Sequence, residues 1–317
     1  MRERHELSVS PEDAGKRLDH FLAEKLSHLS RSFLKKIIES GGVVVAGVSA
    51  RKPGQKVRAG DTVIVAVPEP ETPDLEPDEG IEVGILYEDD HLAVINKPAG
   101  LVVHPAAGHA RGTLVNALLA RLGKLSEGSE AFRPGIVHRL DKETSGVMVV
   151  AKSERAHRGL AEQFSRHTIT RQYRGIVHGR FRVKEGVVDT LIGRHPLHRK
   201  KMAVLGERGK RAVTEYRVLE ERGDFSLVLF TLKTGRTHQI RVHTSHLGHP
   251  IVGDVVYSTR SRRVTVKGKE GKRVVVVERN LLHAFRLGFV HPVTGEAMDF
   301  SVPDPADFAD FWEALRR

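Results

Sequence analysis

The chain has 317 residues, 39% of them hydrophobic and 29% charged, which suffices for packed cores and excludes a mainly disordered protein. It contains no cysteine, which excludes disulfides, iron–sulfur clusters, thiolate metal sites and cysteine nucleophiles. The net charge of +11 favours a polyanionic partner.

Residues 1–67 combine two short helices with a strand-rich tail. Leu18, Phe21, Leu22 and Leu26 recur at helical spacing, and a second helix is predicted from Ser30 or Ser32 to Gly41-Gly42. Basic residues lie off the apolar stripe of the second helix and in the loop after it: Arg31, Lys35, Lys36, Arg51 and Lys52. A single charge run usually marks only a solvated face, but two clusters favour a small α/β domain that binds RNA.

Residues 68–80, PEPETPDLEPDEG, predict a linker. They hold four prolines and six acidic residues but no basic residue. Prolines prevent a regular helix or a central strand, and the acids repel one another. We therefore expect separate folded units at 1–67 and 81–317.

Residues 81–317 alternate strand patterns with helices. ILYEDDHLAVINK predicts a hairpin, and Leu114, Leu118 and Leu122 mark a helix that Gly123 ends. GVMVVAK predicts a strand, followed by a helix through Ala156, Leu160 and Phe164. TEYRVLE and FSLVLFTLK are two further strands at hairpin distance. Strands outnumber helices and many are neighbours in sequence, so we expect a mixed α+β fold on a largely antiparallel sheet.

Motifs for cofactors and metals are absent from the sequence. It has neither a Walker glycine-lysine loop nor a strand-linked dinucleotide fingerprint. His238, His243, His246 and His249 are close in sequence, but their spacing is not that of a tight ligand set. We therefore expect no cofactor and no metal.

The segment HRLDKETSG is the strongest candidate for chemistry. Asp141 lies in a polar turn between Arg139 and Lys142, directly before the strand GVMVVAK. Nearby cations lower the pKa of a carboxyl group, which keeps it ionised as a nucleophile or base. Taken alone, an RLD tripeptide is more often a turn with a surface ion pair.

Two candidate partners for Asp141 follow along the chain. Tyr173, in TRQYRGIVHG, has a ring that could stack on a flat base. Arg241, in GRTHQIRVH, follows a strand, and Thr237 could cap a helix with Arg241 in its early part. An arginine fork matches a carboxylate with two parallel hydrogen bonds.

Together, HRLDKETSG, the downstream tyrosine, GRTHQIRVH and NKPAGLVVHP resemble the RluA-type pseudouridine synthases over nearly the whole chain. Residues 1–67 resemble the alpha-L RNA-binding motif. The resemblance implies conversion of specific uridines of large-subunit (23S) ribosomal RNA, or of a pre-ribosomal particle, to pseudouridine. It implies an isomerase that flips its target base out of the RNA stack. We also expect a cytoplasmic monomer with no membrane partner.

The resemblance also implies a role for each matching residue. Asp141 would be the catalytic aspartate, Tyr173 would stack on the target base and assist a late proton removal, and Arg241 would pair with Asp141. Arg139 would occupy the space left by the flipped nucleotide. Leu282, in LLHAFRLGF, would pack beneath the tyrosine. Whether Asp141 attacks the ribose or removes a ribose proton stays open.

Two basic segments are candidate phosphate contacts. One includes Arg199, Lys200 and Lys201, and the other, Arg260 to Arg279, holds eight Lys or Arg against two Glu and predicts a basic hairpin or a mobile loop. Three alternatives remain open: a relative that modifies other large-subunit uridines, a non-catalytic RNA-binding assembly factor, and a hydrolase that releases the base.

Overall fold

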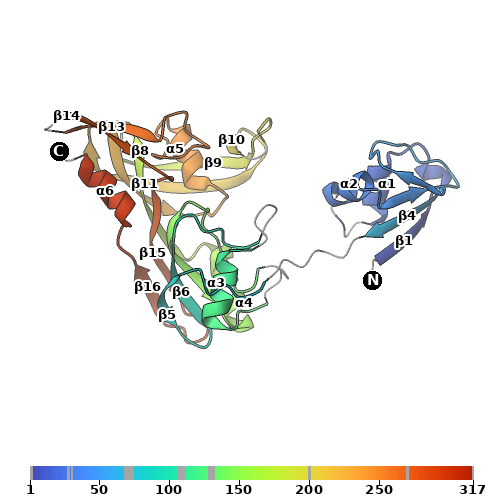
Figure 1. Cartoon of the computed structure of the whole chain (residues 1–317), viewed down its shortest axis with the longest axis horizontal. Coiled ribbons are helices and arrows are strands. Elements are labelled where there is room, and N and C mark those ends of the chain that lie inside the picture. Colours follow the sequence, from blue (N-terminus) through green and yellow to red (C-terminus); the bar gives the residue numbers. More distant parts are fainter. Residues whose placement is uncertain are drawn as a thin grey trace. The chain divides into compact units, whose positions relative to one another are not determined.

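The computed structural model describes residues 3–26, 29, 31–67, 75–105, 111–127, 133–198, 201–268 and 271–315. The chain divides into two compact units, residues 1–72 and 73–317 (Figure 1). Residues 68–74 of the expected linker lie outside the described residues. The two units are described separately below.

The first unit is a four-stranded antiparallel sheet with two helices. Its sheet has the order β1-β4-β2-β3. The elements are β1 (Glu3–Ser8), the 3-10 turn η1 (Pro11–Asp13), α1 (Leu18–Lys25), α2 (Arg31–Glu39), β2 (Val43–Val45), β3 (Val48–Ala50) and β4 (Thr62–Val67). Phe21 and Leu22 of α1 pack with Leu34 and Ile38 of α2 in one core. The helical spacing seen in the sequence therefore places these apolar residues on faces that meet.

The second unit is built on a ten-stranded sheet with the order β10-β9-β11-β12-β8-β15-β7-β6-β5, and β16 pairs with β15. Among the described strands of this sheet, only β15 and β7 pair in parallel. Its strands are β5 (Gly84–Glu88), β6 (Leu92–Lys97), β7 (Ser145–Ala151), β8 (Thr170–His178), β9 (Glu185–Arg194), β10 (Met202–Leu205), β11 (Lys210–Arg222), β12 (Phe225–Leu232), β15 (Leu282–Val290) and β16 (Ala297–Ser301). The expected mixed, largely antiparallel α+β fold is confirmed.

Four helices and a separate hairpin complete the second unit: α3 (Leu114–Leu122), α4 (Glu154–Arg166), α5 (Gln239–His246), α6 (Ala306–Ala314), β13 (Arg263–Gly268) and β14 (Gly271–Val276). The basic segment predicted as a hairpin or a loop is the β13–β14 hairpin. No helix in the described ranges is both long and apolar enough to cross a membrane.

Strands β6 and β7 are buried on both faces, which fixes the layers of the sheet. Ala93 and Ile95 face one core with Leu114 of α3, whereas Leu92 and Val94 face another with Leu160 of α4. Successive side chains of a strand point to opposite faces, so continuous apolar runs arise where helices cover both sides. This part of the sheet is therefore enclosed on both sides, and Asp141 lies in the loop that enters β7.

Residues 75–80 of the expected linker lie against the second unit. The backbone N–H of Asp78 donates to the carbonyl of Asn116, and the Asn116 side chain donates to the carbonyl of Glu76. The same Asn116 side chain closes the capping box at the N-terminus of α3 with Thr113. This end of the acidic segment is therefore part of the second unit.

Candidate active site

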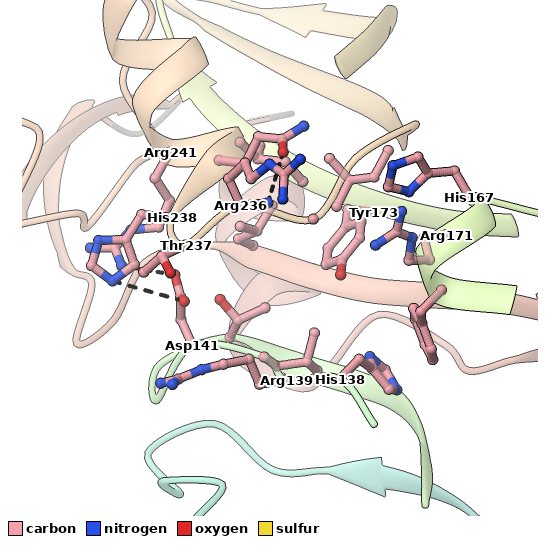
Figure 2. A pocket seen from close by; sticks show the side chains of 18 of the residues that line it. His138, Arg139, Asp141, His167, Arg171, Tyr173, Arg236, Thr237, His238 and Arg241 are labelled. Carbon is pink, nitrogen blue, oxygen red and sulfur yellow. Dashed lines mark hydrogen bonds and ion pairs between the residues drawn. The ribbon is translucent and has the colours of Figure 1, made fainter. Parts of the chain in front are cut away.

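A pocket of about 470 Å³ opens where β8, α5, β15 and the loop before β7 meet. Five residues proposed from the sequence line it: Arg139, Asp141, Tyr173, Arg241 and Leu282. Figure 2 shows Asp141, Arg241 and His238 on one side of the pocket and Tyr173 and Arg171 on the other. Residues up to 143 positions apart in sequence are thus gathered in one cavity.

Asp141 lies in a tight loop before β7. The buried Lys97 links this loop to the loop that follows β6. The backbone N–H of Thr144 donates to the Asp141 carbonyl, which forms a turn directly before β7. The ammonium of Lys97 is fully buried and donates to the carbonyls of Pro98, Leu101 and Lys142. Although burial lowers the pKa of Lys97 to about 7, three carbonyl acceptors match its three N–H donors. The NKPAG segment therefore supports the loop of Asp141.

Arg241 is the third residue of α5 and joins two aspartates. Its Nη1 donates to Asp141 Oδ2 at 2.9 Å, while Nε and Nη2 donate to Asp254 at 2.7 and 3.0 Å. Asp254 is buried and also accepts from the backbone N–H groups of Val256 and Tyr257. The fork on Asp254 fixes the guanidinium plane, so that one N–H points at Asp141.

Burial and charge pairing act in opposite directions on the pKa values of Arg241 and Asp254. Burial alone would lower the pKa of Arg241, but Asp254 and Asp141 outweigh it and raise that pKa above its ordinary value. Burial likewise opposes the effect of Arg241 on Asp254, whose pKa is nevertheless lowered. Hydrogen bonds to the charged forms account for both directions. Arg241 therefore places one fixed, positively charged N–H donor beside Asp141, while its charge is balanced on the other side by Asp254.

The predicted helix cap at Thr237 is wrong. Residue 238 is the N-cap of α5, in the left-handed conformation with φ of 58° and without a side-chain capping bond. The Gln239 side chain instead accepts from the backbone N–H of Arg236 and from the Thr234 hydroxyl. The expected position of Arg241 early in the helix is nevertheless observed.

His238 lies against Asp141 as well. Its Nε2 is 3.8 Å from Asp141 Oδ1, and its Nδ1 is 2.7 Å from the Tyr257 hydroxyl. Burial lowers the pKa of His238, and Asp141 only partly opposes this, so the ring is neutral at neutral pH. The Tyr257 hydroxyl accepts from the backbone N–H of Met202, and its ring stacks on the Arg241 guanidinium at 5.0 Å.

Tyr173 forms the opposite wall from the middle of the sheet. It lies on β8, packs in the same core as Leu282 and is buried. Leu282 pairs with Gly175, whose position two residues after Tyr173 faces the same side of the strand. Burial raises the pKa of Tyr173 to about 12, so the hydroxyl carries its proton at neutral pH.

The remaining predicted RNA contacts lie outside this pocket or at its rim. Arg139 is exposed where it lines the cavity. Lys35, Lys36, Arg51 and Lys52 are exposed in the first unit, Arg31 donates to buried Asp19 at 2.7 Å, and Lys201 is half-buried beside β10. Arg199 and Lys200 lie outside the described residues.

Sequence reasoning missed three residues of the site, and for only one of them did the sequence carry a usable signal. Asp254 stands 13 residues beyond Arg241 in a loop, where no helical or strand period links the two. Lys97 lies in a motif, NKPAGLVVHP, whose role the sequence alone does not reveal. Arg171 precedes Tyr173 by two residues and therefore shares its face of β8, which strand periodicity could have indicated.

Comparisons with known proteins agree with this architecture. The family model described as RNA pseudouridylate synthase matches residues 91–246, and the S4 domain model matches residues 16–63. The chain is 45% identical over 311 residues to an RNA pseudouridine synthase of Aquifex aeolicus (strain VF5), covering 98% of this chain and 96% of that protein. It is 46% identical to the ribosomal large subunit pseudouridine synthase D of Zymomonas mobilis subsp. mobilis, covering 98% and 97%.

A solved structure is also similar. The human RNA pseudouridylate synthase domain containing 1 protein is 28% identical and has a TM-score of 0.56, covering 76% of this chain and 97% of that one. The chain belongs to the RNA pseudouridylate synthase family, and its first unit holds an S4 domain. It is an RNA pseudouridine synthase, as the sequence motifs predicted.

Proposed function

We propose that this enzyme converts specific uridines of large-subunit ribosomal RNA to pseudouridine, with Asp141 as the catalytic aspartate. The name of the Zymomonas relative supports the substrate. The observation that carries the catalytic assignment is the Asp141 carboxylate, held by Arg241 in a pocket whose opposite wall is Tyr173.

In this proposal Asp141 starts the reaction at the ribose. Either its carboxylate attacks the anomeric carbon, or it removes the proton at the 2′ carbon to give a glycal. In both routes the bond between the anomeric carbon and the base nitrogen breaks, and the detached uracil rotates. Carbon-5 then bonds to the anomeric carbon, which releases the Asp141 carboxylate in the first route and is accompanied by return of the proton to the 2′ carbon in the second. Carbon-5 finally loses its own proton. Arg241 orients the carboxylate, because its guanidinium is itself immobilised by Asp254.

Tyr173 holds the face of the flipped base throughout. Its buried ring on β8 is a stacking platform, and Leu282 packs in the same core. The hydroxyl enters the reaction protonated, because burial raises its pKa to about 12. For the late removal of the carbon-5 proton, the hydroxyl must first pass its own proton onward.

Substrate access requires that the uridine leave its stack, which costs a few kcal/mol. Arg139, exposed at the pocket rim, is suited to fill the space that the nucleotide leaves. The exposed basic residues of the first unit and Lys201 would contact phosphates, as would Arg199 and Lys200. The domain bounds proposed are 1–67, 68–80 and 81–317, with residues 75–80 of the acidic segment resting on the second unit. The proposal takes the enzyme to be a monomer.

The test is tritium release from large-subunit ribosomal RNA labelled at carbon-5 of uridine, for wild type and Asp141→Asn side by side. That hydrogen is lost only if carbon-5 becomes the new attachment point. We expect release by wild type and none by the variant, with RNA affinity within a few fold. Release by the variant would remove Asp141 from the chemistry.

Other outcomes separate the alternatives. Tight RNA binding without release by either protein, on RNA and on immature ribosomal subunits alike, would favour an assembly factor. Free uracil in the mixture would reveal a hydrolase. Release that maps to other uridines would identify a different target site within the same reaction class.

A further inference from the structure

Arg171 is a buried cation that has no counter-ion in the described parts of the chain. It is 7% exposed, as buried as Arg241, and it lines the active-site pocket. Its Nε and Nη2 have no hydrogen-bond partner among the described residues. Arg241, in contrast, donates to two aspartates. A buried guanidinium with unused N–H donors is unfavourable, and its presence calls for an explanation.

The surroundings of Arg171 keep its charge directed into the pocket. Its guanidinium lies 5.7 Å from the ring centre of Phe164, and His138 stacks on that ring at 4.5 Å. Gly235 leaves room for it, because a Cβ at that position would lie 2.6 Å from Arg171 Nη1. Burial, aided by the nearby Arg236, lowers the pKa of Arg171, yet an arginine stays charged at neutral pH.

The position of Arg171 relative to Tyr173 indicates what it contacts. The two residues alternate along β8 and are both buried on the same face. Positions two apart on a strand are about 7 Å apart, slightly more than the width of a pyrimidine ring. A base stacked on Tyr173 therefore presents an edge, with its carbonyl oxygens, toward the guanidinium. Because Arg171 is buried, it is poorly placed to contact a backbone phosphate.

We propose that Arg171 binds the edge of the target uracil and stabilises the negative charge that the base carries when it is detached. This inference rests on the proposed function. When the glycosidic bond breaks, its electron pair stays on the base, giving a uracil monoanion with charge shared between N1, O2 and O4. In one route the anomeric carbon bonds to the Asp141 carboxylate. In the other, the electron pair of the broken bond between the 2′ carbon and its hydrogen forms a double bond between the 2′ and anomeric carbons. Both routes therefore release the same uracil anion. Fixed donors aimed at developing charge are an effective form of catalysis.

The unpaired state of Arg171 before substrate binding follows from this role. A carboxylate partner within the protein would have to be displaced by the base and would neutralise the charge that the anion needs. The unpaired N–H donors of Arg171 are therefore available to the substrate, and leaving them unpaired lowers the stability of the free protein. Replacing Arg171 by an apolar side chain of similar length should accordingly leave the fold equally stable or more stable.

The test compares Arg171→Met with wild type on two RNAs, one with uridine and one with 5-fluorouridine. Fluorine makes the detached base a weaker base, so its anion needs less help. We measure the single-turnover rate of glycosidic bond loss at saturating enzyme, by mass spectrometry of nuclease digests. We expect Arg171→Met to be slower by roughly 100-fold on uridine RNA and by roughly 10-fold or less on 5-fluorouridine RNA.

Three further measurements make the result specific. The midpoint of thermal unfolding of Arg171→Met should equal or exceed that of wild type, whereas loss of a merely structural arginine would lower it. The control variant is Arg286→Met. Arg286 is an exposed arginine that pairs with Asp299 and lies opposite Gln172 on the neighbouring strand, so its loss should leave both rates unchanged. Gly235→Ala keeps Arg171 but displaces its guanidinium. It should also slow bond loss more on uridine RNA than on 5-fluorouridine RNA, but by a smaller factor than Arg171→Met.

The inference is overturned if Arg171→Met slows both RNAs equally. It is also overturned if the rate at saturation is normal and only the affinity falls, with a salt dependence smaller by about one charge, since that marks a phosphate contact. Wild-type enzyme that fails to cleave either RNA would instead overturn the proposed function, and this inference with it.

Discussion

The candidate active site and the S4 domain use basic residues in opposite ways. In the pocket, Arg241 is buried and each of its nitrogens donates to Asp141 or Asp254. In the first unit, Arg51 and Lys52 are exposed, and neither forms an ion pair with another described residue. A buried arginine held by two carboxylates sets geometry, whereas an exposed one supplies charge that salt screens.

Arg31 stands between these two extremes. It is half exposed, yet it donates to Asp19, a buried acid that also accepts from Arg17. Burial alone would raise the pKa of Asp19, but the two arginines outweigh it and lower that pKa to about 2. Part of the basic face proposed for RNA binding is therefore already engaged in holding α1 against α2.

Among the variants that test this contrast between buried and exposed basic residues, we expect the largest loss of stability and activity at Asp254, because Asp254 pairs with the buried Arg241. Asp254→Asn keeps the shape of the side chain but turns an acceptor of four N–H groups into a poorer one. Breaking a buried ion pair typically costs about 3–5 kcal/mol of folding free energy. We expect a loss of that size in urea unfolding and a loss of roughly 100-fold in tritium release, because Arg241 is no longer held.

The matched control for Asp254 is Asp299→Asn, which breaks the exposed pair with Arg286. Exposed pairs contribute about 0–1 kcal/mol, so its unfolding and its activity should be close to wild type. Full activity of Asp254→Asn would show that Asp141 alone fixes the position of Arg241.

Tyr173→Phe separates the stacking face from the hydroxyl. The ring remains on β8, so the base should still be held and the glycosidic bond should still break. The late proton removal loses its assistant, and we expect product formation to fall by about 100-fold while bond cleavage changes little. Stopped single-turnover samples would then accumulate a broken-bond intermediate. Product formation at the wild-type rate would make the hydroxyl a bystander.

Elements and local motifs could be predicted from this sequence because their determinants are local. Leu114, Leu118 and Leu122 predict α3, and Gly123, with φ of 69°, ends it as expected. Asp141, Tyr173 and Arg241 were proposed from motifs and do line one pocket. Asp254 and the unpaired state of Arg171 could not be predicted, because burial and pairing depend on loops brought together by the whole sheet.

His243 is a buried titratable residue whose contribution to stability depends on pH. Its two ring nitrogens lie 2.8 and 3.0 Å from the hydroxyls of Thr214 and Thr190, and burial lowers its pKa to about 4. The unfolded chain binds a proton near pH 6.5, whereas the folded protein does not until about pH 4. The stabilisation from His243 is therefore complete above pH 6.5 and is lost as the pH falls toward 4, by up to about 1.4 kcal/mol per pH unit.

His243→Gln should lower the free energy of unfolding at pH 7.5 but make its decline between pH 6.5 and 4 shallower by about one proton. Urea unfolding at a series of pH values measures both quantities. The control is His20→Gln, because His20 lies on the exposed face of α1. An unchanged slope for His243→Gln would mean that other buried groups govern the acid sensitivity of this unit.

The smallest effect is expected on the exposed side, from Arg51→Gln combined with Lys52→Gln. Each lost phosphate contact reduces the dependence of log affinity on log salt by about one. We expect a weakening of RNA binding of a few fold at low salt that disappears at high salt, with the rate at saturating RNA unchanged. The control removes two cations that already pair with acids, through Arg286→Gln and Lys184→Gln, and should leave the salt slope alone. A lower rate at saturation would mean that the first unit positions RNA for the chemistry and does more than supply charge.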